Sequence, residues 1–161
     1  MSLKNVKATY IFPTPLHDGL SKNNVFKIND ATFTIYKSQQ YQIHITGIKS
    51  INLLEYYKLA LEDKYNQYIR NVRIDNMFFT RRQRRNIDMC NLFYYMKTNK
   101  KYFTQYNLET FCGMFIQPNN KFYPTIILFG TGTFTLMGGK SYNAIKESDL
   151  FVCNLTKMFQ K

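Results

Sequence analysis

The chain contains an internal repeat, which restricts the folds open to it more than any single residue does. One copy has an apolar segment at 34–36, an alternating segment at 43–46, and then Gly47-Ile48-Lys49-Ser50. The other copy has an apolar segment at 126–129, a strand-like segment at 134–137, and then Gly138-Gly139-Lys140-Ser141. This duplication predicts two similar halves related by a pseudo-two-fold axis, with a functional surface that follows the same symmetry.

Each copy is typical of a strand, a tight turn, a second strand, and a Gly-x-Lys-Ser segment that opens an amphipathic helix. Upstream, Lys4-Asn5-Val6-Lys7 is similar to Arg70-Asn71-Val72-Arg73, so an Asn-Val pair opens each half. A chain of 161 residues has room for one domain made of two fused halves. We therefore expect a single domain over 1–161, with repeat one at about 1–66 and repeat two at about 67–161.

Alternating apolar and polar residues predict strands, and apolar residues at helical spacing predict three helices. We expect strands at 3–12, 25–28, 32–36, 41–46, 71–79, 111–117, 124–129 and 133–137, and helices at 52–66, at 87–98 and from 143 onward. Asn52 and Glu55 have the spacing of a capping pair for the first helix. The first half contains no recognisable counterpart of the second helix. The pattern indicates an α+β fold.

The charge balance favours a polyanionic partner. The chain has 22 Lys+Arg against 10 Asp+Glu, a net charge of +12, and each phosphate that a cation neutralises releases counterions. Abundant Asn, Lys, Ile and Tyr are also what an A·T-rich genome produces, so charge alone is weak evidence. The basic run Arg81-Arg82-Gln83-Arg84-Arg85 is compatible with a solvated loop, a nuclear localisation patch or a phosphate clamp.

We expect neither catalysis nor a metal or cofactor. Gly138-Gly139-Lys140-Ser141 ends like a phosphate-binding loop, but Phe134 stands where that motif needs its first glycine. His44 lies in an alternating strand without a nucleophile motif, and the carboxylates are scattered along the chain. The three cysteines lack metal-ligand spacing and are expected to be reduced and partly buried.

No apolar run reaches the roughly 20 residues that a membrane-spanning helix needs. The first residues also lack the apolar stretch of a signal peptide. These observations predict a soluble, intracellular protein with no membrane partner, located in the nucleus or in a cytoplasmic viral factory.

The segment 126–140 resembles the core of the TATA-box-binding protein (TBP) family. It shares an apolar strand that ends in Phe129, a turn with Gly130 and Gly132, a second strand, and Gly-x-Lys at 138–140. Phe111-Cys112-Gly113 is similar to the Phe-Pro-Gly of the family, and the first-half copy repeats Gly-x-Lys. The resemblance covers nearly the whole chain, most strongly residues 107–141. The short first half is typical of a streamlined, diverged member, of the kind expected in a large DNA virus.

The resemblance implies a saddle: one curved antiparallel sheet of about ten strands with helices on its convex face. In this family the concave face lies on a widened minor groove, and phenylalanine pairs wedge between base steps and kink the duplex. It implies a non-enzymatic transcription initiation factor that binds A·T-rich promoter DNA and helps recruit the transcription machinery.

Carried over residue by residue, the resemblance assigns wedges, groove-reading residues and phosphate contacts. Phe111 and Phe129 are the wedges of the second half, Tyr36 is the second wedge of the first half, and the first wedge falls near Leu20. Asn5 and Asn71 read the acceptors shared by A·T and T·A pairs. The remaining DNA-binding candidates are Lys7, His44, Thr46, Arg73 and Thr135 on the DNA face, Lys49 and Lys140 toward phosphates, and Arg81, Arg82, Arg84 and Arg85 as further phosphate contacts.

Several positions depart from the family, where the DNA face is small and apolar. Lys7, Arg73, His44 and Thr135 replace such residues here, so strict TATA specificity is not expected. Glu109 falls in the loop with which the family recruits its B-type initiation factor, and RNA polymerase machinery follows as a partner.

Two alternatives remain open: a structural subunit of a heteromeric transcription complex without intercalation, and a single-strand nucleic-acid binder with aromatic stacking platforms.

Overall fold

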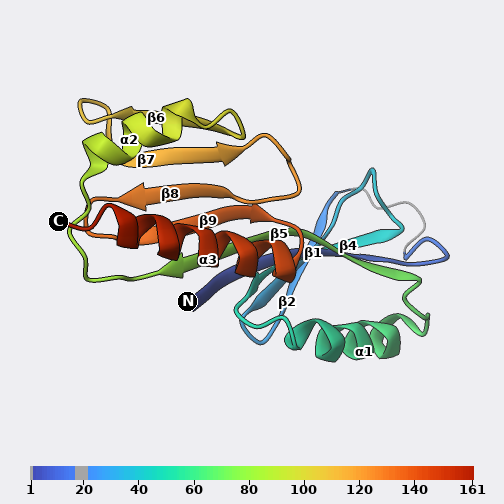
Figure 1. Ribbon diagram of the computed structural model, residues 1–161. Coiled ribbons are helices and arrows are strands. Elements are labelled where there is room, and N and C mark those ends of the chain that lie inside the picture. Colours follow the sequence, from blue (N-terminus) through green and yellow to red (C-terminus); the bar gives the residue numbers. More distant parts are fainter. Residues whose placement is uncertain (1, 17–21) are drawn as a thin grey trace. The chain divides into compact units, whose positions relative to one another are not determined.

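The computed structural model describes residues 2–16 and 22–161, and its helices and strands are labelled in Figure 1. The strands are β1 (Ser2–Ile11), β2 (Asn24–Ile28), β3 (Ala31–Ile35), β4 (Gln42–Ile48), β5 (Asn71–Arg81), β6 (Tyr102–Asn107), β7 (Phe111–Pro118), β8 (Thr125–Phe129) and β9 (Phe134–Gly139). The helices are α1 (Leu53–Tyr65), α2 (Met89–Thr98) and α3 (Tyr142–Met158). The predicted α+β class is confirmed.

The chain divides into two compact units. The first unit is Lys4–Asn76, and the second unit is Met77–Lys161 together with the first residues of β1. Neighbouring strands hydrogen-bond in the order β2-β3-β4-β1-β5-β9-β8-β7-β6. The pairs within each half, β1 with β4, β2 with β3, β3 with β4, β5 with β9, β6 with β7, β7 with β8 and β8 with β9, are antiparallel. Read outward from β1 and from β5, the two halves repeat the same order, except that β6 has no counterpart among the described first-half residues.

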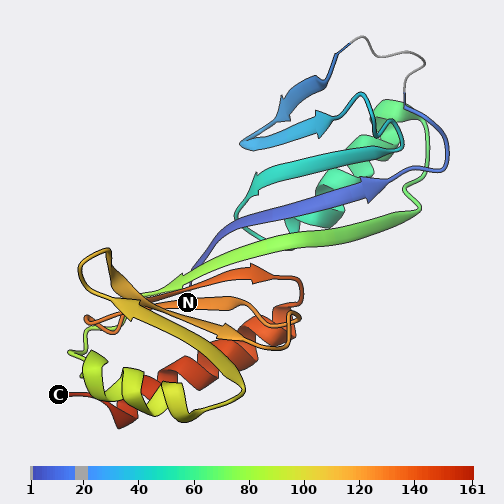
Figure 2. The same ribbon diagram turned by 90° about the horizontal axis from the view of Figure 1, so that it is seen from above.

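Helices cover one face of the strands in each unit. In the first unit, Val6, Ala8 and Tyr10 are fully buried, and the Tyr10 hydroxyl donates a 2.9 Å hydrogen bond to the Leu54 carbonyl of α1. In the second unit, α2 and α3 lie on the same side of β6–β9 (Figure 2). Because side chains alternate along a strand, the residues between these core positions point to the uncovered face.

The repeated glycines before lysine are structural. Gly47 has φ +90° and Gly138 has φ +84°, a left-handed conformation that side chains rarely adopt. In both places the strand register shifts: Val6 pairs with Ile48, and Met77 pairs with Gly139. The two Gly-x-Lys motifs are therefore matching β-bulges at the ends of β4 and β9, which explains them without a bound phosphate.

One local prediction from the sequence is wrong, and one predicted helix begins two residues later than expected. Asn52 makes no capping hydrogen bond because its backbone is already helical, and Glu55 bonds to Lys58 instead. The helix predicted at 87–98 is α2, which begins at Met89 because Asp88 caps it by accepting from the Asn91 N–H. Strand β6 was not predicted, since its sequence Tyr-Phe-Thr-Gln-Tyr-Asn shows no clean alternation of apolar and polar residues.

Candidate nucleic-acid interface

The uncovered face of the first unit carries a polar network across three adjacent strands. Thr9 on β1 and His44 on β4 are direct cross-strand partners. The Thr9 hydroxyl donates its proton to Asp75 on β5, so its oxygen accepts from His44 Nδ1, 3.0 Å away. Arg73 completes the network with a 2.8 Å bond from its Nε to Asp75 Oδ1.

His44 is held in one tautomer by this network. Nδ1 carries a proton, and Nε2 lies 2.7 Å from Oε1 of the Gln39 side chain. A neutral ring accepts at Nε2 and therefore needs the amide nitrogen there, whereas a protonated ring needs the amide oxygen. Burial lowers the pKa of His44 below its ordinary value, and Lys7 and Arg73 act in the same direction, while Asp75 raises it. The neutral form is therefore favoured at neutral pH.

Asn5 is oriented by the bulge of β4. Its Oδ1 accepts a 2.9 Å hydrogen bond from the Gly47 N–H, which identifies the oxygen of the amide unambiguously. The Nδ2 group, with two donors, then lies on the other arm of the amide. Because A·T and T·A pairs present only acceptors in the minor groove, this orientation suits the predicted role of Asn5.

The repeat places Asn76, not Asn71, at the position equivalent to Asn5. Asn5 precedes Val6, which pairs next to the Gly47 bulge, and Asn76 precedes Met77, which pairs next to the Gly138 bulge. The equivalence inferred from the two Asn-Val pairs is therefore corrected by five residues. Asn71 is exposed near the start of β5, and its contact with DNA remains a prediction.

The uncovered face of the second unit is aromatic. The ring of Phe111 lies 5.2 Å from that of Phe115 and 5.8 Å from that of Phe129. Gly113 lies between them on β7, and a Cβ built there would come within 2.5 Å of Phe111 Cε1. The glycine thus allows the Phe111 ring to lie across the strand. We call Phe111, Phe115 and Phe129 the aromatic cluster; the sequence predicted two of its members and missed Phe115.

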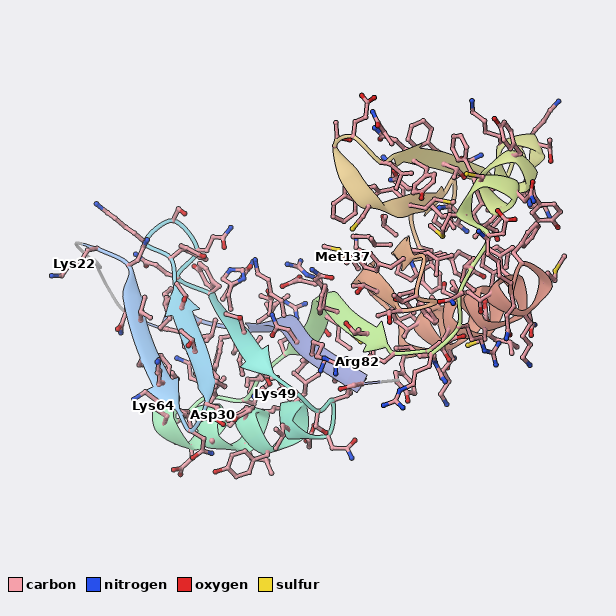
Figure 3. The ribbon with its side chains drawn as sticks, turned by 90° about the vertical axis from the view of Figure 1, so that its left-hand side faces the viewer. Lys22, Asp30, Lys49, Lys64, Arg82 and Met137 are labelled. Carbon is pink, nitrogen blue, oxygen red and sulfur yellow. The ribbon has the colours of Figure 1, made fainter. Side chains whose placement is uncertain are left out.

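Beside the aromatic cluster, β5 and β9 contribute smaller and mixed side chains to the same face. The hydroxyls of Thr80 and Thr135 lie 3.4 Å apart. Phe78 pairs with Met137, which is 39% exposed and is labelled in Figure 3. Met137 precedes the Gly138 bulge as Thr46 precedes the Gly47 bulge, so the two halves differ at this position.

The other predicted contact residues of the first half lie around β3 and β4. Tyr36 follows β3, is exposed, and has its ring 5.1 Å from that of His44. Thr46 pairs with Thr32 and shares the face of His44. Lys49 is exposed just beyond β4, and Lys140 is exposed just beyond β9. The predicted first wedge, near Leu20, lies outside the described residues.

The arginine run forms an ordered strap along the second unit. Arg81 makes a two-point ion pair with Asp149 of α3, with both distances 2.6 Å, which raises the pKa of the guanidinium. Gln83 accepts from the Thr156 hydroxyl, and the Arg85 N–H donates to the Thr131 carbonyl. Arg81 is therefore committed to α3 and is a poor candidate for a phosphate contact.

Alternation along the strap leaves Arg82 and Arg84 exposed. Arg82 is labelled in Figure 3, and both side chains line open depressions of the surface. Arg85 is half-buried, and its Nη1 makes no hydrogen bond among the described residues. The segment 82–86 forms no helix or strand, and its exposed arginines, Arg82 and Arg84, are free to meet solvent or an anion, so both interpretations of the run, solvated loop and phosphate clamp, stay open.

Glu109 lies in the turn between β6 and β7, where its N–H donates to Asn107 Oδ1. The carboxylate is exposed beside Leu108, which is 64% exposed. This turn is the place that the family resemblance indicated for Glu109.

The described residues offer no grouping of three His, Cys, Asp or Glu side chains able to hold a metal ion. None of the helices in the described part of the chain is long and apolar enough to cross a membrane. Cys90 and Cys112 are exposed and Cys153 is half-buried, and all three are free thiols.

The fold defines an α+β protein of two repeats, in which antiparallel strands carry helices on one face of each unit. No protein-family model matches the sequence, and no curated protein matches it in sequence comparison. Among solved structures, the chain is similar to Methanococcus jannaschii TBP, with a TM-score of 0.68 over 98% of both chains. The chain therefore has a TBP-like fold. The two sequences are 15% identical, so the likeness concerns the fold, and function is argued from the residues.

Proposed function

We propose that this protein is a TBP-like transcription initiation factor that binds duplex DNA through the minor groove and bends it. The observation that carries the proposal is the aromatic cluster, which stands on the uncovered face of a TBP-like fold above Gly113. Inserting an apolar side chain between two base pairs costs a few kcal/mol of lost base stacking. This cost is offset because the bent DNA contacts more of the protein surface. Non-enzymatic action, without a cofactor, is part of the proposal.

The polar residues of the first unit support the same role. Asn5 presents amide donors, and Lys7 and Arg73 add positive charge on strands β1 and β5. Tyr36 would serve as the first-half wedge, with a ring supported by His44. Asn76 joins Asn5 as the second asparagine of the pair. Thr46, Thr135, Lys49 and Lys140 complete the proposed DNA contacts.

Recruitment of the transcription machinery is proposed to use the turn between β6 and β7. Glu109 and the exposed Leu108 give this turn a carboxylate beside an apolar contact. The partner would be a B-type initiation factor, followed by RNA polymerase machinery.

The test is a bending assay by fluorescence energy transfer on end-labelled, A·T-rich duplexes. Phe111→Ala and Phe129→Ala should each reduce the bend and weaken binding roughly tenfold, because each removes a wedge. Gly113→Ala keeps both rings but displaces Phe111, and should reduce bending likewise. Phe122→Ala is the matched control, since this exposed ring lies in the loop between β7 and β8.

Bending and affinity unchanged in all three variants would contradict the wedge assignment. The aromatic cluster also favours a second candidate, a single-strand binder that stacks bases on Phe111, Phe115 and Phe129. Competition between the duplex and its separated strands decides between the two functions. If neither form of DNA binds, both functions are contradicted, and the alternative of a structural subunit of a transcription complex is the one to test next.

A further inference from the structure

A carboxylate stands among the donors on the uncovered face of the first unit. The Asp75 side chain is 20% exposed and lies on β5, next to Thr9 and Arg73. Asn5 and Lys7 on β1 and Arg73 on β5 present N–H donors on this face. Asp75 is therefore an acceptor in a surface that otherwise suits the acceptors of A·T pairs.

The position of Asp75 is fixed by hydrogen bonds from two strands. Thr9 donates to Oδ2, and Arg73 donates to Oδ1, while His44 holds the Thr9 hydroxyl from a third strand. An ionised carboxylate has about four acceptor sites, so these two bonds leave it with acceptor capacity. The result is a charged acceptor that is held in place before any ligand arrives.

The minor groove offers such an acceptor a single kind of partner among the bases. A·T and T·A pairs show only the acceptors adenine N3 and thymine O2, whereas G·C pairs add the guanine N2 amino donor. Opposite an A·T pair, a carboxylate loses its hydrating water and finds no hydrogen-bond donor on the bases, which costs binding free energy. Opposite guanine, it gains a charge-assisted hydrogen bond.

We propose that Asp75 selects a G·C pair in the part of the DNA site that lies on the first unit, by accepting from guanine N2. This inference rests on the proposed function, since it requires the uncovered face to lie in the minor groove. The preference is confined to one half of the site. At the positions equivalent to Thr9, His44 and Asp75 in the repeat, the chain has Thr80, Thr135 and Lys4, so the carboxylate is not repeated.

The experiment compares guanine with inosine, which lacks only the N2 amino group. One G·C pair is moved step by step through an A·T-rich duplex that the protein bends, and each guanine is then replaced by inosine. The wild-type protein should bind the guanine duplex at least about fivefold more tightly at one or two positions, all in the same half. Asp75→Ala, which removes both acceptor oxygens, should abolish this difference and keep the affinity for the all-A·T duplex within about threefold.

Glu55→Gln is the matched control, because it removes one negative charge from α1, on the covered side of the same unit. It should leave the preference for guanine over inosine unchanged. Thermal unfolding checks that Asp75→Ala is folded, and the wild-type comparison tests the inference without any variant.

Two failures are distinguishable. If the wild type bends the A·T-rich duplex but does not distinguish guanine from inosine at any position, the role of Asp75 is refuted and the proposed function stands. If the wild type binds no duplex, both fail together. A guanine preference that survives in Asp75→Ala would also overturn the assignment.

Discussion

At the scale of single residues, His44 has an environment that makes the stability of the protein depend on pH. Its Nδ1 donates to Thr9, and the charged side chains around it are Asp75 and Arg73 from β5 and Lys7 from β1. Burial outweighs the attraction of Asp75 and lowers the pKa below the ordinary value of about 6.5. The unfolded chain therefore binds a proton at a pH where the folded chain does not.

The sign of the effect follows from this difference. The stabilisation from the neutral His44 ring is fully present above about pH 6.5 and is lost as the pH falls toward the pKa of the folded state. Below that pKa both states carry the proton, and the free energy of unfolding no longer changes with pH through this group. We expect urea unfolding between pH 8 and 5 to show a loss of stability in the wild type that is smaller in His44→Gln. A difference between the two proteins that stays constant over this range would show that His44 titrates normally.

Some candidate functional residues could be located from local sequence motifs, and others depend on long-range contacts that leave no such motif. The Phe111 and Phe129 rings could be located from the Phe-Cys-Gly and apolar-strand motifs, because those motifs are local. The Asn-Val repeat indicates Asn71 and misses Asn76, because the feature that distinguishes them is the register of β5 against β9, which is a long-range property. Likewise, the ion pair between Arg81 and Asp149 joins residues that are 68 positions apart, so no local sequence pattern predicts it.

At the scale of elements, the packing of α3 on β9 depends on Gly139. A Cβ built on this residue would lie 2.3 Å from Ile145 Cδ1 and 2.8 Å from Ile145 Cγ1, and Ile145 is fully buried. The helix and the strand must therefore separate, or Ile145 must leave its place, if a methyl group is added. This explains why the second copy of the motif has a second glycine, whereas the first copy has the core residue Ile48.

We expect Gly139→Ala to reduce the free energy of unfolding by about 1–3 kcal/mol, because it overpacks the interface between α3 and β9. Gly130→Ala is the control, since a Cβ there meets only Met89 Cγ at 3.7 Å. It should change the free energy of unfolding by no more than about 0.5 kcal/mol. Denaturant unfolding measures both, and equal values for the two variants would argue against a tight contact at Gly139.

The elements themselves were predictable to different degrees. Alternation revealed β4, and the repeat revealed β8 and β9, because their inward residues are consistently apolar. Strand β6 has Phe103, Gln105 and Asn107 on its exposed side. Because Phe103 is an apolar residue on the exposed side, the alternation of apolar and polar residues that predicts a strand is absent. After β5, the segment 82–87 is held by the bond between Gln83 and Thr156 of α3 and by backbone hydrogen bonds from Arg85 and Ile87 to the turn between β8 and β9.

At the scale of the whole molecule, positive charge is distributed unequally between the two units. Residues 77–161 carry 12 Lys+Arg and 4 Asp+Glu, whereas residues 4–76 carry 10 and 6, giving net charges of +8 and +4. If both units bind one duplex, the second should contribute more of the salt-dependent affinity, because the dependence on salt counts the phosphates that cations neutralise.

The exposed arginines of the strap allow this to be measured. Each phosphate contact contributes about 0.9 to the slope of log affinity against log salt concentration. The double variant Arg82→Gln and Arg84→Gln should therefore lower the slope by about 2 if both arginines reach phosphates. The control, Lys58→Gln with Lys64→Gln, removes the same charge from α1 on the covered side of the first unit.

The outcome separates local contacts from the general field of the protein. A slope that falls in the strap variant and stays constant in the control assigns Arg82 and Arg84 to phosphates. Equal small losses of affinity in both variants, without a change of slope, would mean that the strap adds only to the overall positive potential. Arg81→Gln should leave the slope unchanged in either case, because its guanidinium already neutralises Asp149.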